Sequence, residues 1–205
     1  LDEYIKICKD IGYEYCYIST NGSLANLDKF IKLVEAGLDS IKFSVNGGTR
    51  EIYKEIHAKD NFDKVIENIK GLDNYRKSNN KKIWLGVSFV AVPKSKKSFY
   101  SLEKILGKHV DEIIMYEANN QSGQVEHLNP GFEKCSLPFA KAHFTVEGYM
   151  RACCNDYENF LALEDIKKMS IKDAWNGERF KKLRKKHIED KLDGTLCGKC
   201  IRNSK

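Results

Sequence analysis

The stretch "NLDKFIKLVEAGLDSIKFSVNGG" (residues 26–48) decides the fold class. In its first half, Leu27, Phe30 and Val34 recur at helical spacing, and a glycine then ends the pattern as a C-cap does. In its second half, "SIKFSV" (40–45) is rich in β-branched and aromatic residues and stops at the turn-forming "NGG". The stretch therefore predicts a helix followed by a strand.

The same alternation runs through roughly the first 118 residues. Strands separated by helices imply parallel β-α-β units, in an open sheet or a closed barrel. The apolar segment "KIWLGVSFVAV" predicts a strand that is buried on both faces and stopped by a proline. The expected strands span residues 13–20, 40–45, 82–92 and 111–118, and the expected helices 1–12, 26–37, 49–56, 61–76 and 100–108.

Polar segments follow each of these strands. Because ligands of parallel α/β proteins gather at the carboxyl ends of the strands, such segments belong to one rim. A single Asn-Gly turn is common and needs no ligand, but four polar ends in series favour a small polar ligand. The four ends are "STNGS" (19–23), "SVNGG" (44–48), "AVPKS" (91–95) and "EANNQSG" (117–123).

The last third of the chain has a different pattern. "AHFTVEGYMRAC" predicts a hairpin that turns near Glu147 and Gly148. Ser170 is the expected N-cap of a helix that an Asn-Gly pair at 176–177 interrupts. The linker-like composition of 119–131 separates the two regions, and we predict domains at 1–128 and 129–205.

Five of the seven cysteines lie in this last third. Thiols of a non-secreted chain are expected to be reduced, which favours metal or catalytic roles over disulfides. Four of them, Cys135, Cys153, Cys197 and Cys200, include a C-x2-C knuckle, a strong sign of a metal site. Four thiolates suit zinc and an iron–sulfur cluster equally, and buried cysteines without a ligand are the simpler alternative.

The adjacent pair Cys153 and Cys154 needs a separate explanation. Neighbours on a strand point to opposite faces, so only one of the two is expected to face a given site. Asp156, just beyond, is interpreted first as a turn aspartate and second as a base or hydrogen-bond partner.

Charge and hydropathy exclude some functions. The basic runs "KSKK" (94–97) and "KKLRKK" (181–186) have no interleaved aromatic residues, so they indicate solvated surface and nucleic acid binding is not expected. The longest apolar run, 83–92, is about half a membrane span, so no membrane association is expected.

At this point the motifs resemble a known family. "TNG" closing a strand, "LVEAGLDSIKFSVNGGTREIYKEI" and "NFDKVIENI" resemble the radical S-adenosylmethionine (SAM) enzymes. The tail "C…PF…VEGYMRACCND…SIKDAWNGERFKKLR…C-x2-C" resembles the SPASM/twitch extension of that superfamily. The resemblance implies an α/β fold, with the C-terminal part of a partial (β/α)6 TIM-like barrel and a small α+β SPASM/twitch domain.

One family feature is absent from the sequence. No C-x3-C-x2-C loop, which binds the reducing [4Fe–4S] cluster in the family, occurs in it. We therefore expect roughly the first third of the enzyme to precede residue 1, with that second [4Fe–4S] cluster, and we expect this chain alone to be inactive in SAM cleavage.

The resemblance also assigns residues, by motif position only. Ser19, Thr20 and Asn21 would frame SAM, Ser44 would contact its methionine or ribose part, and Asn119 would approach the adenine. Ser88 is given no such role, and His57 and Lys59 are interpreted as an exposed helix end. The implied ligands of one auxiliary [4Fe–4S] cluster are Cys135, Cys153, Cys197 and Cys200, with Cys154 supporting them.

The function that these assignments imply is a radical SAM oxidoreductase. A 5′-deoxyadenosyl radical would abstract hydrogen, and the auxiliary cluster would accept an electron, as in twitch-type dehydrogenases; no catalytic residue is assigned. The substrate would be a small molecule or a peptide, the electron donor a flavodoxin or ferredoxin, and the location cytoplasmic. The alternatives are a peptide-modifying maturase of the same superfamily and a non-catalytic zinc-binding interaction module.

Overall fold

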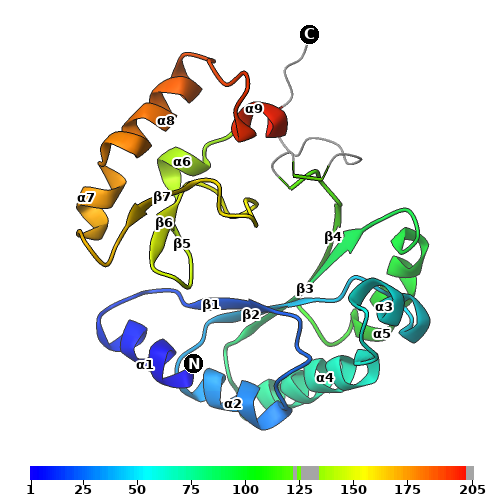
Figure 1. The fold of residues 1–205 in the computed structure, drawn as a ribbon. Coiled ribbons are helices and arrows are strands. Elements are labelled where there is room, and N and C mark those ends of the chain that lie inside the picture. The colour runs from blue at the N-terminus through cyan, green and yellow to red at the C-terminus, as the bar shows by residue number, and fades with distance from the viewer. Residues whose placement is uncertain (122–123, 126–133, 202–205) are drawn as a thin grey trace. The chain divides into compact units, whose positions relative to one another are not determined.

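The computed structural model describes residues 1–121, 124–125 and 134–201. It divides into two compact units, Leu1–Glu117 and Ala118–Lys205 (Figure 1). The domain boundary predicted between residues 128 and 129 lies outside the described residues, so it stays a prediction.

The first unit is an α/β structure built on a parallel sheet of four strands in the order β1-β2-β3-β4. Each strand is joined to the next by helical segments, as the alternating sequence pattern predicted. The strands are β1 (Tyr17–Thr20), β2 (Ser40–Ser44), β3 (Trp84–Ala91) and β4 (Glu112–Glu117). The helices are α1 (Asp2–Asp10), α2 (Leu27–Glu35), α3 (Arg50–His57), α4 (Phe62–Ser78), the short 3-10 helix η1 (Lys96–Ser98) and α5 (Phe99–Leu106).

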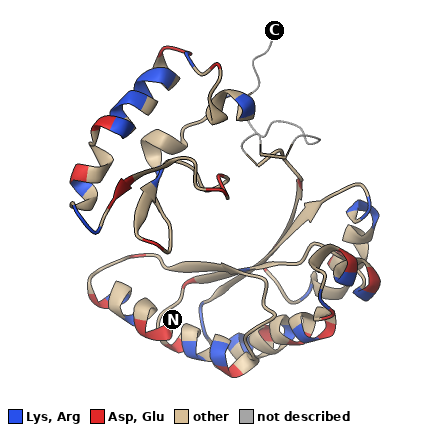
Figure 2. Ribbon diagram, in the orientation of Figure 1, with Lys and Arg blue, Asp and Glu red and all other residues tan. Residues whose placement is uncertain are grey.

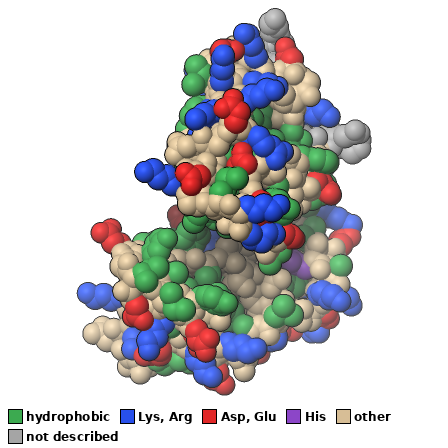
Figure 3. All heavy atoms as spheres, turned by 60° about the vertical axis from the view of Figure 1, so that its left-hand side comes forward, with side chains coloured by type: hydrophobic (Ala, Val, Ile, Leu, Met, Phe, Trp, Pro, Cys, Tyr) green, Lys and Arg blue, Asp and Glu red, His purple; other side chains and the backbone are tan. Residues whose placement is uncertain are grey.

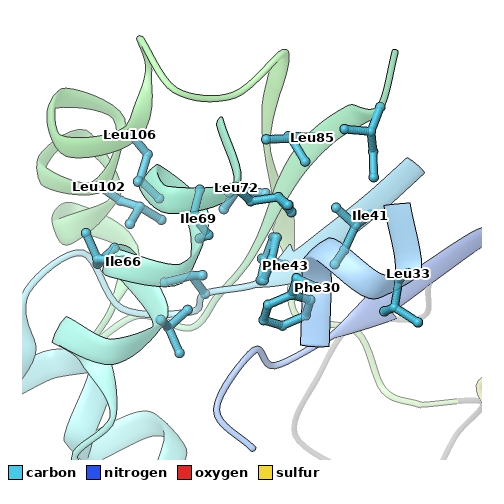
Figure 4. Packing of buried hydrophobic residues seen from close by; sticks show 14 of the residues in the cluster. Phe30, Leu33, Ile41, Phe43, Ile66, Ile69, Leu72, Leu85, Leu102 and Leu106 are labelled. Atoms are coloured by element: carbon cyan, nitrogen blue, oxygen red, sulfur yellow. The ribbon is translucent and has the colours of Figure 1, made fainter. Parts of the chain in front are cut away.

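One face of this sheet carries the core. Ile41 and Phe43 of β2 and Val87 of β3 are completely buried, and each is two residues from the next inward side chain of its strand, as the strand period requires. Helices α1, α2 and α4 lie along this face (Figure 1). Figure 4 shows the contacts, in which Phe30 and Leu33 come from α2, Ile66, Ile69 and Leu72 from α4, and Leu102 and Leu106 from α5.

The opposite face of the sheet is more polar and less buried. Along β3, Trp84 and Ser88 are half-buried and Val90 is exposed, while the residues between them are buried. The prediction that this strand is buried on both faces is therefore wrong. Burial alternates along the strand with a period of two. The apolar run did not reveal this alternation, because small or amphipathic side chains occupy the second face.

The first strand is shorter than predicted. The segment 13–20 predicts eight strand residues, but β1 begins only at Tyr17, where pairing with Ser40 of β2 starts. The tyrosines at 13 and 15 remain 60% exposed or more, and Figure 3 shows hydrophobic side chains on the surface of this unit. Aromatic β-propensity does not make a strand where no partner strand runs alongside.

The second unit is small and mixed. A three-stranded antiparallel sheet, in the order β5-β6-β7, packs against helices through Met150, Ala152 and Phe180, which are completely buried. Its elements are α6 (Leu137–Ala140), β5 (His143–Phe144), β6 (Tyr149–Arg151), β7 (Ala162–Asp165), α7 (Ile171–Trp175), α8 (Glu178–Ile188) and α9 (Leu196–Cys200).

The hairpin and the helix break predicted for this region are confirmed. Strands β5 and β6 pair across a turn in which Gly148 has a φ of +87°, a conformation that favours glycine. The Ser170 side chain accepts a hydrogen bond from the Asp173 backbone N–H, which caps α7. Helix α7 ends before the Asn-Gly pair, and α8 begins after it.

Helix α8 carries the longer basic run. Lysines on its outer surface are exposed, and Figure 2 shows Lys and Arg along the helix. Arg184 differs, because its guanidinium lies 4.1 Å from the Trp175 ring centroid and donates hydrogen bonds to the carbonyls of Pro138 and Trp175. The run thus combines a solvated surface with one packing arginine. Among the described residues, no helix has the length and apolar character to cross a membrane.

Candidate functional site

Four cysteines of the second unit line a single cavity of about 20 Å³. Cys135 precedes α6, Cys153 follows β6, and Cys197 and Cys200 belong to α9. These positions come from three separate segments, so the fold brings together the four cysteines that the sequence singled out. The remaining wall residues are Pro138, Ala152, Leu161, His187 and Ile201.

The loop after β6 holds Cys153 at this cavity. The Asn155 backbone N–H lies 3.3 Å from the Cys153 sulfur and donates a hydrogen bond to it. Cys154 is exposed and is not part of the cavity wall. The expectation that the pair diverges therefore matches the structure, although the two residues lie in a loop rather than in a strand.

The C-x2-C segment is a short capped helix. The Thr195 side chain accepts a hydrogen bond from the Gly198 backbone N–H at 3.0 Å, which fixes the first turn of α9. A Cβ atom on Gly198 would lie 2.2 Å from the carbonyl oxygen of Leu192. Glycine is therefore the residue that allows the Leu192 carbonyl to approach α9 this closely.

Burial dominates the electrostatics of the thiols. Burial and, to a smaller extent, the nearby Cys153, Cys135 and Cys200 together raise the pKa of Cys197 to about 12. Burial likewise raises the pKa of Cys135 above its ordinary value. At neutral pH these groups are thiols unless a cation binds, because a bound metal replaces the protons.

The donor set fits a sulfur-liganded centre. Four sulfur atoms match the ligation of zinc or of a [4Fe–4S] cluster. All seven cysteines lie in the described part of the chain, and none is in a disulfide. Within the described ranges, no group of three or more His, Cys, Asp or Glu side chains already surrounds a single point. The four cysteines are candidate ligands because their thiols line the same cavity.

Asp156 organises the loop that carries Cys153. Its side chain is completely buried, and its Oδ2 atom accepts a hydrogen bond from the Leu161 backbone N–H at 2.6 Å. Its carbonyl oxygen accepts one from the Arg151 guanidinium. These contacts agree with the interpretation of Asp156 as a turn residue.

In the first unit, two serines meet on the open face of the sheet. Ser44 ends β2, and its Oγ atom lies 3.5 Å from that of Ser88 on β3. No role was predicted for Ser88, because the sequence did not show which face of the sheet its side chain occupies. Ser19 of β1 is exposed and pairs in register with Lys42 of β2.

The residues that follow β1 form a local turn. Thr20 Oγ1 accepts a hydrogen bond from the Gly22 backbone N–H, and Asn21 Oδ1 accepts from both the backbone and the hydroxyl of Ser23. Ser19 and Thr20 line a cavity of about 550 Å³ beside α2, and Asn21 is exposed. Asn21 therefore stabilises the turn in this structure.

Asn119 and His57 have local partners as well. Asn119 belongs to the second unit, and its Oδ1 atom accepts from the Gln121 backbone N–H. The His57 ring stacks on Tyr53 at 4.2 Å, and its Nε2 atom accepts from the Asn46 backbone N–H. The interpretation of His57 as an exposed helix end is wrong, because the imidazole supports the loop after β2. Lys59 is exposed, as expected.

His187 is the cavity residue that the sequence did not indicate. It lies in the last turn of α8, within a basic run whose spacing shows only an ordinary solvated helix. No sequence signal places it near the cysteines, because the contact depends on how α8 packs.

Comparison with known proteins assigns both units. Residues 1–87 match the radical SAM superfamily, and residues 135–201 match the iron-sulfur cluster-binding domain SPASM. An uncharacterized protein of Methanocaldococcus jannaschii is 32% identical over 113 residues, which is 55% of this chain and 37% of that protein. A probable GTP 3′,8-cyclase of Saccharolobus solfataricus is 43% identical over 70 residues, which is 34% of this chain and 22% of that protein.

A solved structure shares the fold. The crystal structure of BtrN in complex with AdoMet and 2-DOIA has a TM-score of 0.59 and 17% identity, and the match covers 99% of this chain and 66% of that chain. This chain spans little more than a third of the M. jannaschii protein and less than a quarter of the cyclase. The two family matches support a radical SAM protein with a C-terminal SPASM domain, and the BtrN structure shares the fold of the chain.

Proposed function

We propose that this chain is part of a radical SAM oxidoreductase whose tail binds one auxiliary [4Fe–4S] cluster as an electron acceptor. The observation that carries the proposal is the convergence of Cys135, Cys153, Cys197 and Cys200 on one cavity within the residues that match SPASM. The superfamily uses [4Fe–4S] clusters and SAM, so both cofactors are implied for the whole protein.

The four thiolates decide which role the tail cluster can have. When bound, SAM would supply hydrogen-atom abstraction, which takes one electron and one proton from the substrate. The auxiliary cluster would accept a second electron as a second proton is released, for a net two-electron oxidation. Four cysteine ligands occupy every iron of a cubane cluster, so the chain leaves no iron position for substrate. The wall around the sulfur atoms includes the apolar side chains of Pro138, Ala152 and Leu161.

The open face of the first unit is the proposed SAM side. Ser44 lies at the carboxyl end of β2, where parallel α/β folds bind ligands, and Ser88 presents an adjacent hydroxyl group from the middle of β3. We add Ser88 to the proposed contacts for that reason, and keep Ser19 and Thr20 as proposed edge contacts. Asn21 and Asn119 are weaker candidates, because local hydrogen bonds already use their side-chain oxygens. A partial (β/α)6 barrel, with further strands beside β1, remains part of the proposal.

The relatives' names support a proposed substrate class. One relative is a probable GTP cyclase and the structural neighbour is crystallised with a small molecule, which favours a small-molecule substrate over a peptide. We propose a flavodoxin or ferredoxin as the electron donor. The peptide maturase remains an alternative of the same chemistry.

Metal analysis tests the proposal. The 205-residue chain, purified without oxygen and reconstituted, is expected to hold about four irons and four sulfides. Cys197→Ala is expected to lose most of them, and Cys154→Ala, which changes the exposed neighbour, is expected to keep them. One zinc per chain without iron would instead establish the structural module and reject the redox function.

A further inference from the structure

The imidazole of His187 forms part of the wall of the cysteine cavity. His187 lies in the last turn of α8 and lines the same cavity as Cys135, Cys153, Cys197 and Cys200. Its Nε2 atom is buried and has no hydrogen-bond partner among the described residues. A buried N–H or ring nitrogen without a partner is costly, so such an atom in a native protein calls for an explanation.

Packing fixes the position of this ring. Phe139 of α6 meets the imidazole at right angles, with ring centroids 6.1 Å apart. One turn earlier on α8, the Arg184 guanidinium donates a hydrogen bond to the Pro138 carbonyl of α6. Helices α6 and α8 are therefore held together, and α6 follows directly after Cys135. The imidazole and this cysteine are placed by the same contact.

The ring can donate a hydrogen bond. An imidazole carries at least one ring N–H whether it is neutral or protonated. The four thiols that share the cavity become thiolates when they bind a cation, and sulfur atoms with negative charge accept hydrogen bonds.

We propose that His187 donates a hydrogen bond from Nε2–H to a sulfur atom of the tail cluster and thereby raises its reduction potential. The inference rests on the proposed function, since it needs the cluster. The reduced cluster carries one more negative charge than the oxidised one, so a hydrogen bond to its sulfur stabilises the reduced form more strongly. His187 is a positioning and tuning residue rather than a catalytic one.

The experiment compares three variants of the reconstituted chain in anaerobic redox titrations followed by electron paramagnetic resonance. His187→Phe keeps a ring against Phe139 and removes the donor, and His187→Gln keeps an N–H donor. His143→Phe is the matched control: its Nε2 atom is also buried without a partner among the described residues, but it does not line the cavity.

The expected result is a tenfold shift toward the oxidised cluster in His187→Phe, equivalent to a midpoint potential about 59 mV more negative for one electron. His187→Gln should recover part of the shift, and His143→Phe should show none. Equal potentials in all four proteins, with the cluster present, would overturn the inference while leaving the proposed function intact. An absence of iron in the unmodified chain would reject the proposed function itself.

A second measurement detects the hydrogen bond directly in the unmodified chain. In the unmodified chain labelled with 15N-histidine, the reduced cluster is expected to show hyperfine coupling to a ring nitrogen. The coupling should persist in His143→Phe. If the unmodified chain holds the cluster and shows no histidine coupling, the hydrogen bond does not exist.

Discussion

Replacing Gly198 with alanine is expected to dismantle the C-x2-C helix. The added Cβ atom would lie 2.2 Å from the Leu192 carbonyl oxygen, whereas contacts of real Cβ atoms essentially never fall below 3.0 Å. The carbonyl cannot withdraw freely, because it accepts hydrogen bonds from both the backbone N–H and the hydroxyl of Thr195. Either α9 or the Leu192 backbone must therefore move by roughly 0.8 Å or more.

The size of the effect follows from these contacts. Overpacking of this kind costs about 1–3 kcal/mol, and losing one hydrogen bond adds about 1 kcal/mol, for a total of about 2–4 kcal/mol. At about 1.4 kcal/mol per tenfold, the equilibrium between the formed and unformed α9 shifts by about 30- to 700-fold. Because Cys197 and Cys200 both belong to α9, the tail should lose affinity for its metal by a comparable factor.

The assay is iron content after reconstitution at limiting iron, together with thermal unfolding of the metal-free chain. Lys199→Ala is the matched control, since this side chain lies between the same two cysteines and is exposed. The control should match the unmodified chain within about 0.5 kcal/mol. If Gly198→Ala binds iron and unfolds like Lys199→Ala, the close approach does not govern the site and the reasoning fails.

Three further predictions concern pH and packing. The pKa of Cys197 is raised from 9.0 to about 12 in the folded chain, so the metal-free form should lose stability as pH rises from about 9 toward 12. Urea unfolding should show a smaller loss of stability in Cys197→Ala. An equal loss in that variant would assign the effect to other groups. Asp73→Asn should destabilise the first unit by about 3 kcal/mol, because the carboxylate is fully buried and ion-paired. Asp63→Asn, at an exposed carboxylate, should change the stability little. Similar denaturation midpoints for the two variants would contradict this prediction. Arg184→Lys should cost about 2 kcal/mol, since lysine cannot reproduce both the stacking on Trp175 and the two carbonyl contacts; an unchanged melting temperature would show that α8 does not depend on them.

The fold of the first unit was largely readable from local patterns. The segment 26–48 predicted a helix and a strand, and α2 and β2 match them within two residues at each end. The helix ends where a glycine with a φ of +99° follows, which periodicity and glycine placement both indicate. The strand at 82–92 was found, but its burial was not, because an apolar run does not reveal which face neighbouring elements cover.

The site was predictable to the extent that it depends on cysteine spacing. Sulfur ligands are few and their spacing is informative, so the four thiols could be chosen before their convergence was known. His187 could not be chosen, because its place at the cavity results from the packing of α8 on α6 through Arg184 and Phe139. The spacing of residues within α8 does not indicate that contact. Ser88 was missed for a related reason, since its face depends on strand register.

The distribution of the four cysteines along the tail has a consequence for the lifetime of the protein. Between Cys153 and Cys197 lie 43 residues, including β7, α7 and α8, so a metal centre held by both closes a long loop. Cross-linking a loop of that length lowers the entropy of the unfolded chain and is worth about 4 kcal/mol. By that measure, a tail without such a centre would open about a thousand times more often, and proteases would cut the opened chain. The supply of iron would then determine the lifetime of each copy of the protein as well as its activity.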